Sequence, residues 1–440
     1  MGKKGRRQIF LAGFWVFAGL LSGCGDDVGV TVSPVKADSS DGLQEAFAAD
    51  GAVWGVPGQE SAPAQAVPEA VGKDNASEEI IPGTAGREEA VGLPADGVVA
   101  ITISAAGDVS MGNYEGQDYA YSFRQSYDRE RRPEYFLEHV RDIFEADDFT
   151  IVNLEGVLTF SEEAAEGRTY HIKGSPDYVS ILTAGSVEGV SMGNNHRLDY
   201  GEAGSRDTGA ALEKAGIVYA YDTTLGVYET KGLRIGFVSV NEASQGAGVE
   251  KFLKDGIEQL KEQGADLILA CCHWGTEGAY QPEEYQTVLG RKCIDWGADL
   301  VIGHHPHVLQ GVEEYHGKYI VYSLGNFCFG ANRNPADKDT AIFQQTFLFR
   351  DGLPQEGGTA RMVPCSISSV TRRNDFRPTP AQGEEARRIL NRLRELSRNL
   401  GLSPGGDPGP DPDKDFHPAS SQGSGADFGE DGTLLKSVPK

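Results

Sequence analysis

Short apolar segments in this sequence end in clusters of polar side chains that are suited to binding a metal ion. The run 298–302 is followed at once by His304, His305 and His307, although the whole chain has only 9 histidines. An apolar run of this length predicts a buried strand. Because side chains alternate in direction along an extended chain, we expect His305 and His307 to face the same side. The sequence therefore predicts a histidine-rich site where a strand gives way to a loop.

Segments with strand-like and helix-like patterns alternate along the chain, which predicts a largely parallel sheet with helices packed on it. Roughly 250 residues take part, enough for one large core. We expect strands at 98–103, 149–152, 233–240, 266–272, 298–302, 319–324, 340–350 and 360–370, the last two antiparallel. We expect helices at 133–144, 249–263, 282–296 and 384–400. The last helix carries Ile389, Leu390, Leu393 and Leu396 on one face, and we expect it to dock on the domain.

The pattern of a strand followed by polar residues recurs at five places. The carboxyl ends of strands in an open α/β sheet line one crevice, so these clusters can meet in space. Carboxylates, amide oxygens and imidazoles together suit Mn, Fe or Zn better than Mg or Ca, and the set is large enough for two ions. The five clusters are Asp108; Asn153 with Glu155; Asn195 with His196; His273; and His305 with His307.

Each of these residues taken alone has an ordinary alternative role. Asp108 and Asn195 are also suited to capping a helix, Glu155 to a solvated loop, and His273 beside Trp274 to a packed core. Their repeated position at strand ends is what favours a common site.

Six motifs, in this order along the chain, resemble the CapA family of bacterial capsule and poly-γ-glutamate synthesis proteins. The resemblance covers roughly residues 101–350. It implies membership of the calcineurin-like metallophosphatase superfamily and a four-layer α/β-β/α sandwich with mixed sheets. The motifs are Gly107-Asp108, Asn153-Leu154-Glu155, Gly193-Asn194-Asn195-His196, His273-Trp274-Gly275-Thr276-Glu277, Gly303-His304-His305-Pro306-His307 and Ser323-Leu324-Gly325-Asn326-Phe327.

The resemblance implies roles for individual residues. His196 resembles the general acid of the superfamily, with Asp199 three residues on to orient it, and Glu155 falls where a bridging carboxylate is expected. The chain departs from the pattern at Ser110, where a histidine is expected, and at Glu155, which replaces an aspartate. The metal ligands implied are Asp108, Glu155, Asn195, His273, His305 and His307, although His304 directly follows the glycine and leaves the register open.

The function that the resemblance implies is metal-assisted hydrolysis or transfer in the synthesis, release or anchoring of a capsule or poly-γ-glutamate envelope polymer. We expect Asn153, Lys173 and Arg197 to contact this anionic polymer, and membrane-bound polymer synthase proteins to be partners. Lys173 lies in a polar loop at 170–174, and the alternative for this loop is a solvated turn without a role in binding. The alternatives for the whole domain are a non-catalytic scaffold that binds polymer or synthase, and a secreted metallophosphoesterase or nucleotidase.

The first residues have the features of an export signal. A basic segment at 3–7 precedes an apolar segment at 9–21, which is too short to span a membrane. The following Leu21-Ser22-Gly23-Cys24 resembles a lipoprotein cleavage site, and an ordinary cleaved signal is the alternative. We therefore expect Cys24 to carry a lipid and to anchor the protein to the cell membrane, outside the cytoplasm.

Composition separates the domain from two polar flanks and excludes some functions. Residues 25–99 read as a disordered tether and 401–440 as a disordered acidic tail. A net charge of −25 argues against nucleic acid as a partner, because phosphate binding needs clustered basic residues. No Gly-Lys pair has the flanks of an ATP phosphate loop, so we do not expect the chain to polymerise glutamate alone.

The five cysteines after Cys24 are expected to be mostly buried, with one disulfide possible.

Overall fold

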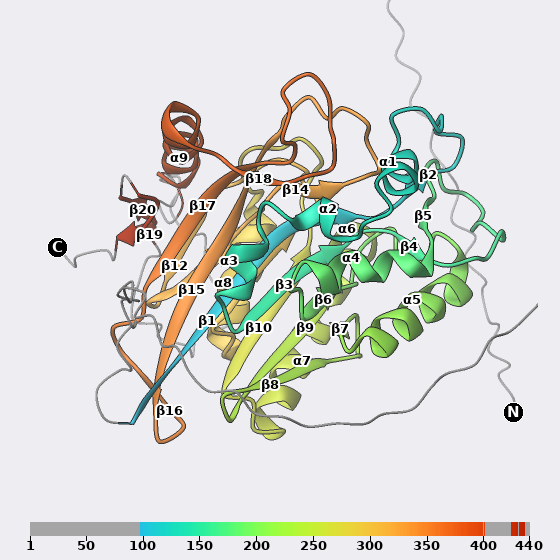
Figure 1. Ribbon diagram of the computed structural model, residues 1–440. Coiled ribbons are helices and arrows are strands. Elements are labelled where there is room, and N and C mark those ends of the chain that lie inside the picture. Colours follow the sequence, from blue (N-terminus) through green and yellow to red (C-terminus); the bar gives the residue numbers. More distant parts are fainter. Residues whose placement is uncertain (1–96, 399, 401–423, 430, 436–440) are drawn as a thin grey trace, which may run out of the picture. The chain divides into compact units, whose positions relative to one another are not determined.

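The computed structural model describes residues 97–398, 400, 424–429 and 431–435, all in one compact unit of the chain (Figure 1). The expected signal segment 1–24, with Cys24, lies outside the described residues. So does the expected tether 25–99, except for its last residues, of which Val98 and Val99 already belong to the first strand. Within the described part of the chain, no helix is long and apolar enough to cross a membrane.

The first sheet has nine strands in mixed orientation. Its order is β18-β17-β15-β1-β3-β6-β7, with β14 also paired to β1 and β16 to β15. β1 is parallel to β3 and antiparallel to β15, and β15 is antiparallel to β17 as expected. The strands are β1 (Val98–Ser110), β3 (Phe149–Leu154), β6 (Gly189–Ser191), β7 (Val218–Ala220), β14 (Asn326–Phe329), β15 (Asp339–Arg350), β16 (Leu353–Gln355), β17 (Ala360–Ser366) and β18 (Thr379–Pro380).

The second sheet has seven strands in the order β19-β12-β13-β11-β10-β9-β8. Its four central strands, β9, β10, β11 and β13, are parallel to one another. The strands are β8 (Gly226–Thr230), β9 (Leu233–Asn241), β10 (Leu267–His273), β11 (Leu300–His304), β12 (Val312–Tyr315), β13 (Lys318–Val321) and β19 (Ser424–Gly425). A separate small sheet is formed by β2 (Asn113–Tyr114), β5 (Ile172–Gly174) and β4 (Val157–Leu158).

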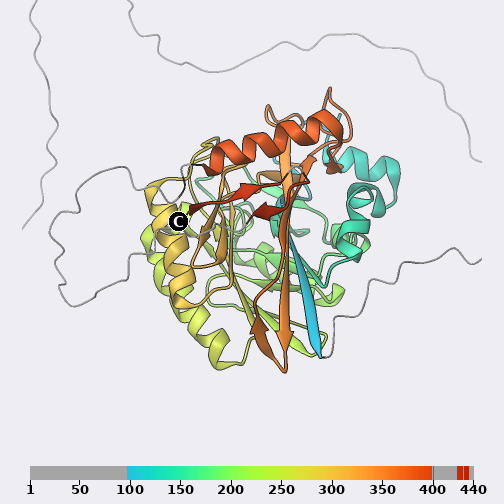
Figure 2. The same ribbon diagram turned by 90° about the vertical axis from the view of Figure 1, so that its left-hand side faces the viewer.

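Helices cover the outer face of each main sheet, on opposite sides of the strands (Figure 2). The first sheet is covered by α1 (Phe123–Glu130), α2 (Glu134–Leu137), α3 (Arg141–Glu145), α4 (Val179–Ala184) and α5 (Gly201–Ala215). The second is covered by α7 (Val249–Glu262) and α8 (Glu284–Trp296), with the short α6 (Glu242–Gln245) before them. The helix expected at 133–144 is in fact two short helices separated by a turn at 138–140, where the Val140 amide donates to the Leu137 carbonyl at 3.0 Å.

Three apolar layers hold the sheets and helices together. One lies between the two sheets, and each of the others lies between a sheet and its helices. Alternation along the strands assigns side chains to these layers: Ile151 and Cys271 point between the sheets, whereas Val152 and Cys272 point toward the helices. All five cysteines of the described residues are buried and unpaired. The expected four-layer α/β-β/α sandwich with mixed sheets is confirmed.

The carboxyl-terminal segment closes one side of the layer between the sheets. Helix α9 (Gly383–Ser397) buries Ile389, Leu390, Leu393 and Leu396 there, so its expected docking is confirmed. The expectation of a disordered tail is wrong for residues 424–429 and 431–435. Strand β19 pairs with β12, and β20 (Asp427–Phe428) and β21 (Leu434–Leu435) form a hairpin whose Phe428 and Leu434 are buried in the same layer. These apolar residues make the segment different from the polar stretch before it.

Candidate metal centre

Strand ends from both sheets meet at one edge of the sandwich, as the sequence predicts. In the first sheet Asp108 of β1 is paired with Asn153 of β3 on one side and with Asn326 of β14 on the other. In the second sheet His273 ends β10 beside His304, which ends β11. The amide nitrogen of Asn153 lies 3.4 Å from Nδ1 of His273, across the two sheets. Residues from distant parts of the chain are thus brought into one site.

Two glycines allow the backbones to come this close. A Cβ on Gly107 would lie 2.0 Å from the carbonyl oxygen of Gly325, and one on Gly303 would lie 1.9 Å from the carbonyl oxygen of Tyr322. The first approach lets the Asp108 amide donate a 2.9 Å hydrogen bond to the Gly325 carbonyl. The glycines that precede the polar residues are therefore required by backbone packing at the site.

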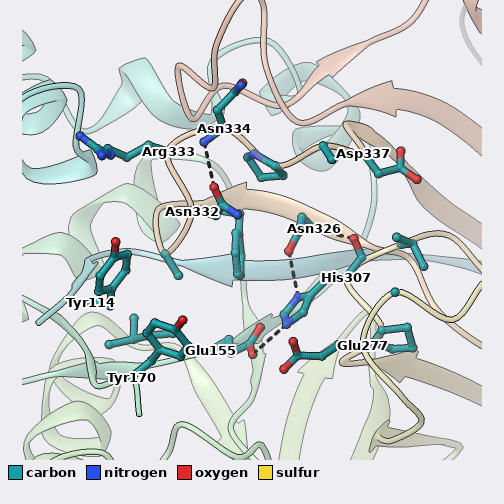
Figure 3. Close-up of a pocket in the computed structure, with 18 of the residues that line it drawn as sticks. Tyr114, Glu155, Tyr170, Glu277, His307, Asn326, Asn332, Arg333, Asn334 and Asp337 are labelled. Atoms are coloured by element: carbon teal, nitrogen blue, oxygen red, sulfur yellow. Dashed lines mark hydrogen bonds and ion pairs between the residues drawn. The ribbon is translucent and has the colours of Figure 1, made fainter. Parts of the chain in front are cut away.

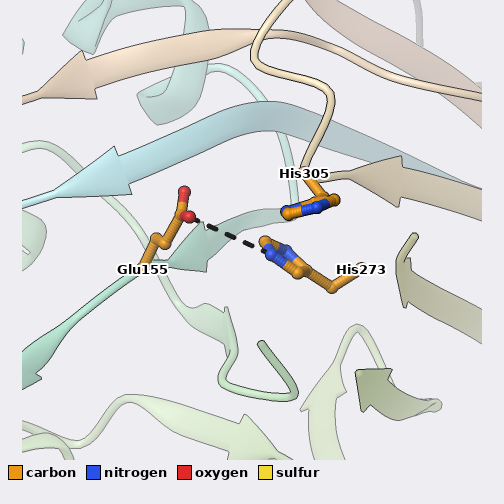
Figure 4. Close-up of side chains that lie close together, drawn as sticks. All are labelled: Glu155, His273 and His305. Carbon is orange, nitrogen blue, oxygen red and sulfur yellow. Dashed lines mark ion pairs between the residues drawn. The ribbon is translucent and has the colours of Figure 1, made fainter. Parts of the chain in front are cut away.

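Glu155, His273 and His305 form the first group of potential ligands (Figure 4). Their ligand atoms lie within 4.8 Å of one another, and all three residues are buried. Oε1 of Glu155 is 3.9 Å from Nε2 of His273, and the rings of His273 and His305 have their centres 4.6 Å apart. This spacing leaves room for a cation between them and is too long for direct hydrogen bonds.

Two further groups share residues with the first. Asp108, Glu155 and His307 form one, and Glu277, His305 and His307 form the other. Oδ2 of Asp108 lies 3.2 Å from Nδ1 of His307, whose Nε2 lies 3.6 Å from Oε1 of Glu155. Glu155 therefore belongs both to the group that contains Asp108 and to the group that contains His273, which is the position that a bridging carboxylate needs.

The unpaired polar atoms of this cluster fit a cation. Oδ2 of Asp108, both carboxylate oxygens of Glu155 and Nδ1 of His305 are buried and accept or donate no hydrogen bond. Leaving a buried charged group unsatisfied costs about 1–3 kcal/mol or more, so such groups are normally paired. Because these atoms converge and are all potential ligands, the residues present fit one or two divalent ions.

Burial and neighbouring charges set the protonation of the cluster. Burial lowers the pKa of His273 well below its ordinary value, and burial with the nearby His307 lowers the pKa of His305 to about 4. Both rings are therefore neutral, the form that binds metals. Burial would also lower the pKa of His307, but Glu155 and Asp108 raise it to about 10. This ring is therefore protonated without metal and would have to release its proton to bind a cation. Burial raises the pKa of Glu155 to about 7.

The backbone at His305 and His307 differs from the extended chain that the sequence suggested. Strand β11 ends at His304, and His305 and His307 have φ of 97° and 57°. The alternation argument is therefore wrong, although both rings still reach the cluster. Nε2 of His304 instead lies 3.2 Å from the Ala106 carbonyl, and His304 belongs to none of the three ligand groups. The geometry thus favours His305 over His304 as the first ligand of this loop.

Asparagine side chains link the clusters. Oδ1 of Asn195 lies 2.9 Å from Nε2 of His273, at the edge of the first ligand group. The neighbouring Asn194 donates hydrogen bonds to Oδ1 of Asn153 at 3.1 Å and to the Leu154 carbonyl at 2.8 Å. Sequence reasoning assigned no role to Asn194. Its bonds fix the 193–196 loop against β3 and so place Asn195 and His196.

His196 is held by a buried carboxylate on one side and faces the cluster on the other. Oδ2 of Asp199 lies 2.7 Å from its Nδ1, and Oε1 of Glu155 lies 3.8 Å from its Nε2. Asp199 is itself fully buried and accepts hydrogen bonds from the Ile172 amide and the Arg168 guanidinium. Burial works against protonation of His196, but Asp199 and Glu155 outweigh it and raise its pKa. The arrangement gives an oriented imidazole that holds a proton beside the ligand groups.

The three residues expected to contact substrate are bonded to other groups of the fold. Asn153 is fully buried and donates a 2.8 Å hydrogen bond to Oδ1 of Asp108, so it positions a ligand candidate. Lys173 is bonded to the Ser161 carbonyl and Glu162. Arg197 is 9% exposed and is bonded to Ser205 and Asp222. The sequence shows Lys173 and Arg197 as positive charges, but it does not show the groups that the fold places against them.

Two further residues contact the cluster, although the sequence predicts no role for them. Oδ1 of Asn326 lies 3.0 Å from Nδ1 of His307, and its Nδ2 donates to the His307 carbonyl at 3.1 Å. Glu277 follows the β10 end and completes the third ligand group. Both lie in motifs that carried the family resemblance, which was the available signal. Ser110, where a histidine was expected, is buried with its hydroxyl unpaired and belongs to none of the groups.

Comparison with known proteins identifies the family. Residues 102–331 match the family described as bacterial capsule synthesis protein PGA_cap. The chain belongs to this family. The match spans all five clusters of the metal centre, and the resemblance seen in the motifs is confirmed.

Curated relatives of this PGA_cap chain are similar over much of its length. The PGA biosynthesis protein CapA of Bacillus subtilis is 26% identical over 325 residues, covering 69% of this chain and 79% of the relative. The capsule biosynthesis protein CapA of Bacillus anthracis is 27% identical and covers 61% and 67%. A crystal structure of a hypothetical protein from Thermus thermophilus is 15% identical, covers 60% of this chain and 99% of that one, and has a TM-score of 0.35.

Proposed function

We propose that this protein acts on a capsule polymer of the poly-γ-glutamate type, outside the cytoplasm, through a metal-dependent hydrolytic site. The family and the names of its Bacillus relatives support a part in capsule or poly-γ-glutamate synthesis. The observation that carries the hydrolytic part is the set of three overlapping ligand groups with unpaired buried carboxylate oxygens. A scaffold alone has no need for this arrangement, which costs stability when no cation is bound.

The residues divide into ligands and a proton donor. Asp108, Glu155, Asn195, His273, His305 and His307 would hold the ions, with Glu277 as a further candidate. We expect two ions, of Mn, Fe or Zn, because the set mixes nitrogen and oxygen donors. Such ions polarise a carbonyl or phosphoryl oxygen and lower the pKa of a bound water to about 7.

His196 would supply the proton that the leaving group needs. Nε2 of His196 faces the ligand groups, whereas Nδ1 is bonded to Asp199, so only Nε2 is free to give up a proton. Asp199 fixes the ring and stabilises its charged form, and the Arg168 guanidinium holds Asp199 in turn. His196 and His307 keep 14% and 20% of their side chains exposed, so the site opens to a substrate from that side.

We propose, for the location, that the chain is lipid-anchored at Cys24 to the outer face of the cell membrane, next to synthase proteins that make the polymer. The basic segment, the short apolar segment and the cysteine motif support this proposal. Cys24→Ser should move the protein from the membrane fraction to the soluble exported fraction. Unchanged membrane association would place the anchor elsewhere.

The activity test compares substrates on one preparation. Full-length protein is loaded with Mn²⁺, Fe²⁺ or Zn²⁺ and given γ-linked glutamate oligomers, phosphodiesters, phosphomonoesters and nucleotides. Metal-dependent cleavage that is lost in both His305→Ala and His196→Gln supports the proposal, and cleavage of the γ-linked amide identifies the substrate class. Cleavage of nucleotides alone would favour the nucleotidase alternative.

One observation favours the non-catalytic alternative. Ser110 contributes no ligand where the superfamily pattern has a histidine, so one ion would be held by fewer residues. Metal content measured on the purified protein separates the two. One tightly held ion with no turnover on any substrate of the panel would favour a scaffold that binds polymer.

A further inference from the structure

A cleft of about 1020 Å³ lies over the metal centre. Glu155, His196, Glu277 and His307 form its floor, and the loop 331–337 forms the wall opposite. Figure 3 shows Arg333 on this wall, across the cleft from Glu155 and His307. A space of this size exceeds what the hydrolysis of one bond requires and is large enough for several residues of a flexible polymer.

Three arginines line the cleft, Arg333 in the loop 331–337 and Arg372 and Arg373 in a second segment, and among the described residues that line the cleft these are the only arginines or lysines. Arg372 is exposed and has no hydrogen bond or ion pair with any described residue. Arg373 places its guanidinium 5.6 Å from the ring centre of Tyr121. Arg333 reaches only the Ala120 carbonyl and, at 3.5 Å, the exposed Asp118.

These charges differ from the other arginines near the site. Arg392 and Arg388 are paired with Asp337 and Asp339, and Arg197 is paired with Asp222. In a chain with a net charge of −25, three neighbouring arginines with so few carboxylate partners are unusual. Their guanidinium groups are available to an anion that enters the cleft.

The two segments that carry the arginines are tied together. The Asn374 amide donates to the Arg333 carbonyl at 3.3 Å, and its side chain donates to the carbonyls of Phe329 and Asn332 at 2.8 and 3.2 Å. Asn374 is buried, so these bonds are shielded from water. The two backbone segments are therefore held next to one another before a ligand arrives, so that only the arginine side chains have to be ordered on binding.

We propose that Arg333, Arg372 and Arg373 bind the carboxylates of a polyanionic glutamate chain and hold it across the cleft so that one of its amides lies over the metal centre. This inference rests on the proposed function. A γ-linked glutamate oligomer carries one free carboxylate on every residue, and the planar guanidinium group pairs with a carboxylate through two parallel hydrogen bonds. The remaining acidic surface repels such a polymer at long range, so capture depends on this local patch.

The test measures binding without turnover. Full-length protein in a chelator is titrated into a fluorescently labelled γ-linked glutamate oligomer, and the dissociation constant is read from anisotropy. Because each lost charge-assisted contact is partly exposed to solvent, Arg372→Gln with Arg373→Gln should weaken binding about tenfold. Added salt should weaken wild-type binding more than that of the double variant.

A matched control removes the same charge elsewhere. Arg387 on α9 is 67% exposed and contacts only Glu384 at 4.0 Å, so Arg387→Gln should bind the oligomer as the wild type does. A second ligand, the same oligomer with its carboxylates converted to amides, should not bind wild-type protein. All variants concern exposed side chains, and equal melting temperatures confirm that they fold.

The outcomes separate this inference from the proposed function. An unchanged dissociation constant in the double variant, equal binding of the amide oligomer, or no binding to wild-type protein would each overturn the inference, even if the protein cleaves another substrate. Arginine-dependent binding without cleavage of any substrate would leave the inference standing and remove the hydrolytic function. Arginine-dependent binding together with cleavage supports both.

Discussion

Glu155 should cost the protein stability when no metal is bound and should increase its stability when metal is present. The side chain is 1% exposed, and neither carboxylate oxygen has a hydrogen-bond partner. Replacing it with glutamine removes the buried charge and keeps nearly the same shape. His307 loses its 3.6 Å ion pair with Glu155 but keeps its 3.2 Å contact with Asp108, and we expect the gain from removing the buried charge to exceed this loss.

The size of the effect follows from the burial. An unsatisfied buried group costs about 1–3 kcal/mol, so Glu155→Gln should stabilise the metal-free protein by about 2 kcal/mol. For about 300 ordered residues the entropy of unfolding is about 0.6 kcal/mol per degree, which converts this gain to about 3 °C in melting temperature. An ion present at about 100 times its dissociation constant should stabilise the wild type by about 2.7 kcal/mol, or about 4 °C.

The assay is a melting curve of both proteins in chelator and in Mn²⁺ at a fixed pH of about 8, above the pKa of about 7 of Glu155, so that its carboxylate is charged. We expect the variant to melt higher in chelator, and the wild type to gain more from metal, so that the difference narrows or reverses. The substitution leaves Asn194 and Asn195 unchanged, so we expect no change in the conformation of the 193–196 loop. A variant that melts lower than the wild type in chelator, or an equal gain from metal in both proteins, would refute the reasoning.

Three further predictions concern other parts of the structure. His196→Gln should lower turnover of a substrate with a poor leaving group about 100-fold while metal content stays the same, because it removes the proton donor and no ligand. The melting temperature should fall only slightly, because Asp199 loses its contact with His196 but keeps its bonds to Ile172 and Arg168. Burial raises the pKa of Asp147 to about 7, so the folded state binds more protons than the unfolded state between about pH 4 and 7, and stability falls as pH rises through that range. Asp147→Asn should therefore melt higher than the wild type at pH 8 and equally near pH 4. Arg392→Met removes hydrogen bonds of 3.1 and 2.5 Å to Asp337 and should cost about 2 kcal/mol, with faster hydrogen exchange in the cleft loop 331–337.

The layers and the strand ends of this fold were predictable from the sequence because they depend on local pattern. Apolar runs at 149–152 and 266–272 are long enough to be strands, and β-branched residues occupy them. The carboxyl ends of parallel strands lie at the same edge of a sheet, so a common site for Asp108, His273 and His307 could be predicted from the alternation of strands and helices.

What could not be predicted depends on partners far apart in the chain. Arg197 and Lys173 read as free cations in the sequence, whereas the fold supplies Asp222 and Glu162 as their partners. The positive φ of His305 could not be predicted, because no neighbouring residue in the sequence indicates it. Phe428 lies in a segment with the composition of a disordered tail. Its burial depends on the apolar surface of α9, which the sequence around Phe428 does not show.

The pairing of β1 with β15 has a consequence for how the chain acquires its structure. Val98 is aligned with Arg350, about 250 residues later in the sequence, so the contact order of the first sheet is high. Until Asp339–Arg350 has been synthesised, β1 keeps an open edge with unpaired backbone groups, which invites pairing with other chains. The domain is therefore expected to fold slowly and only after nearly all of it has been made, and its first strand is the segment most in need of protection from aggregation in the meantime.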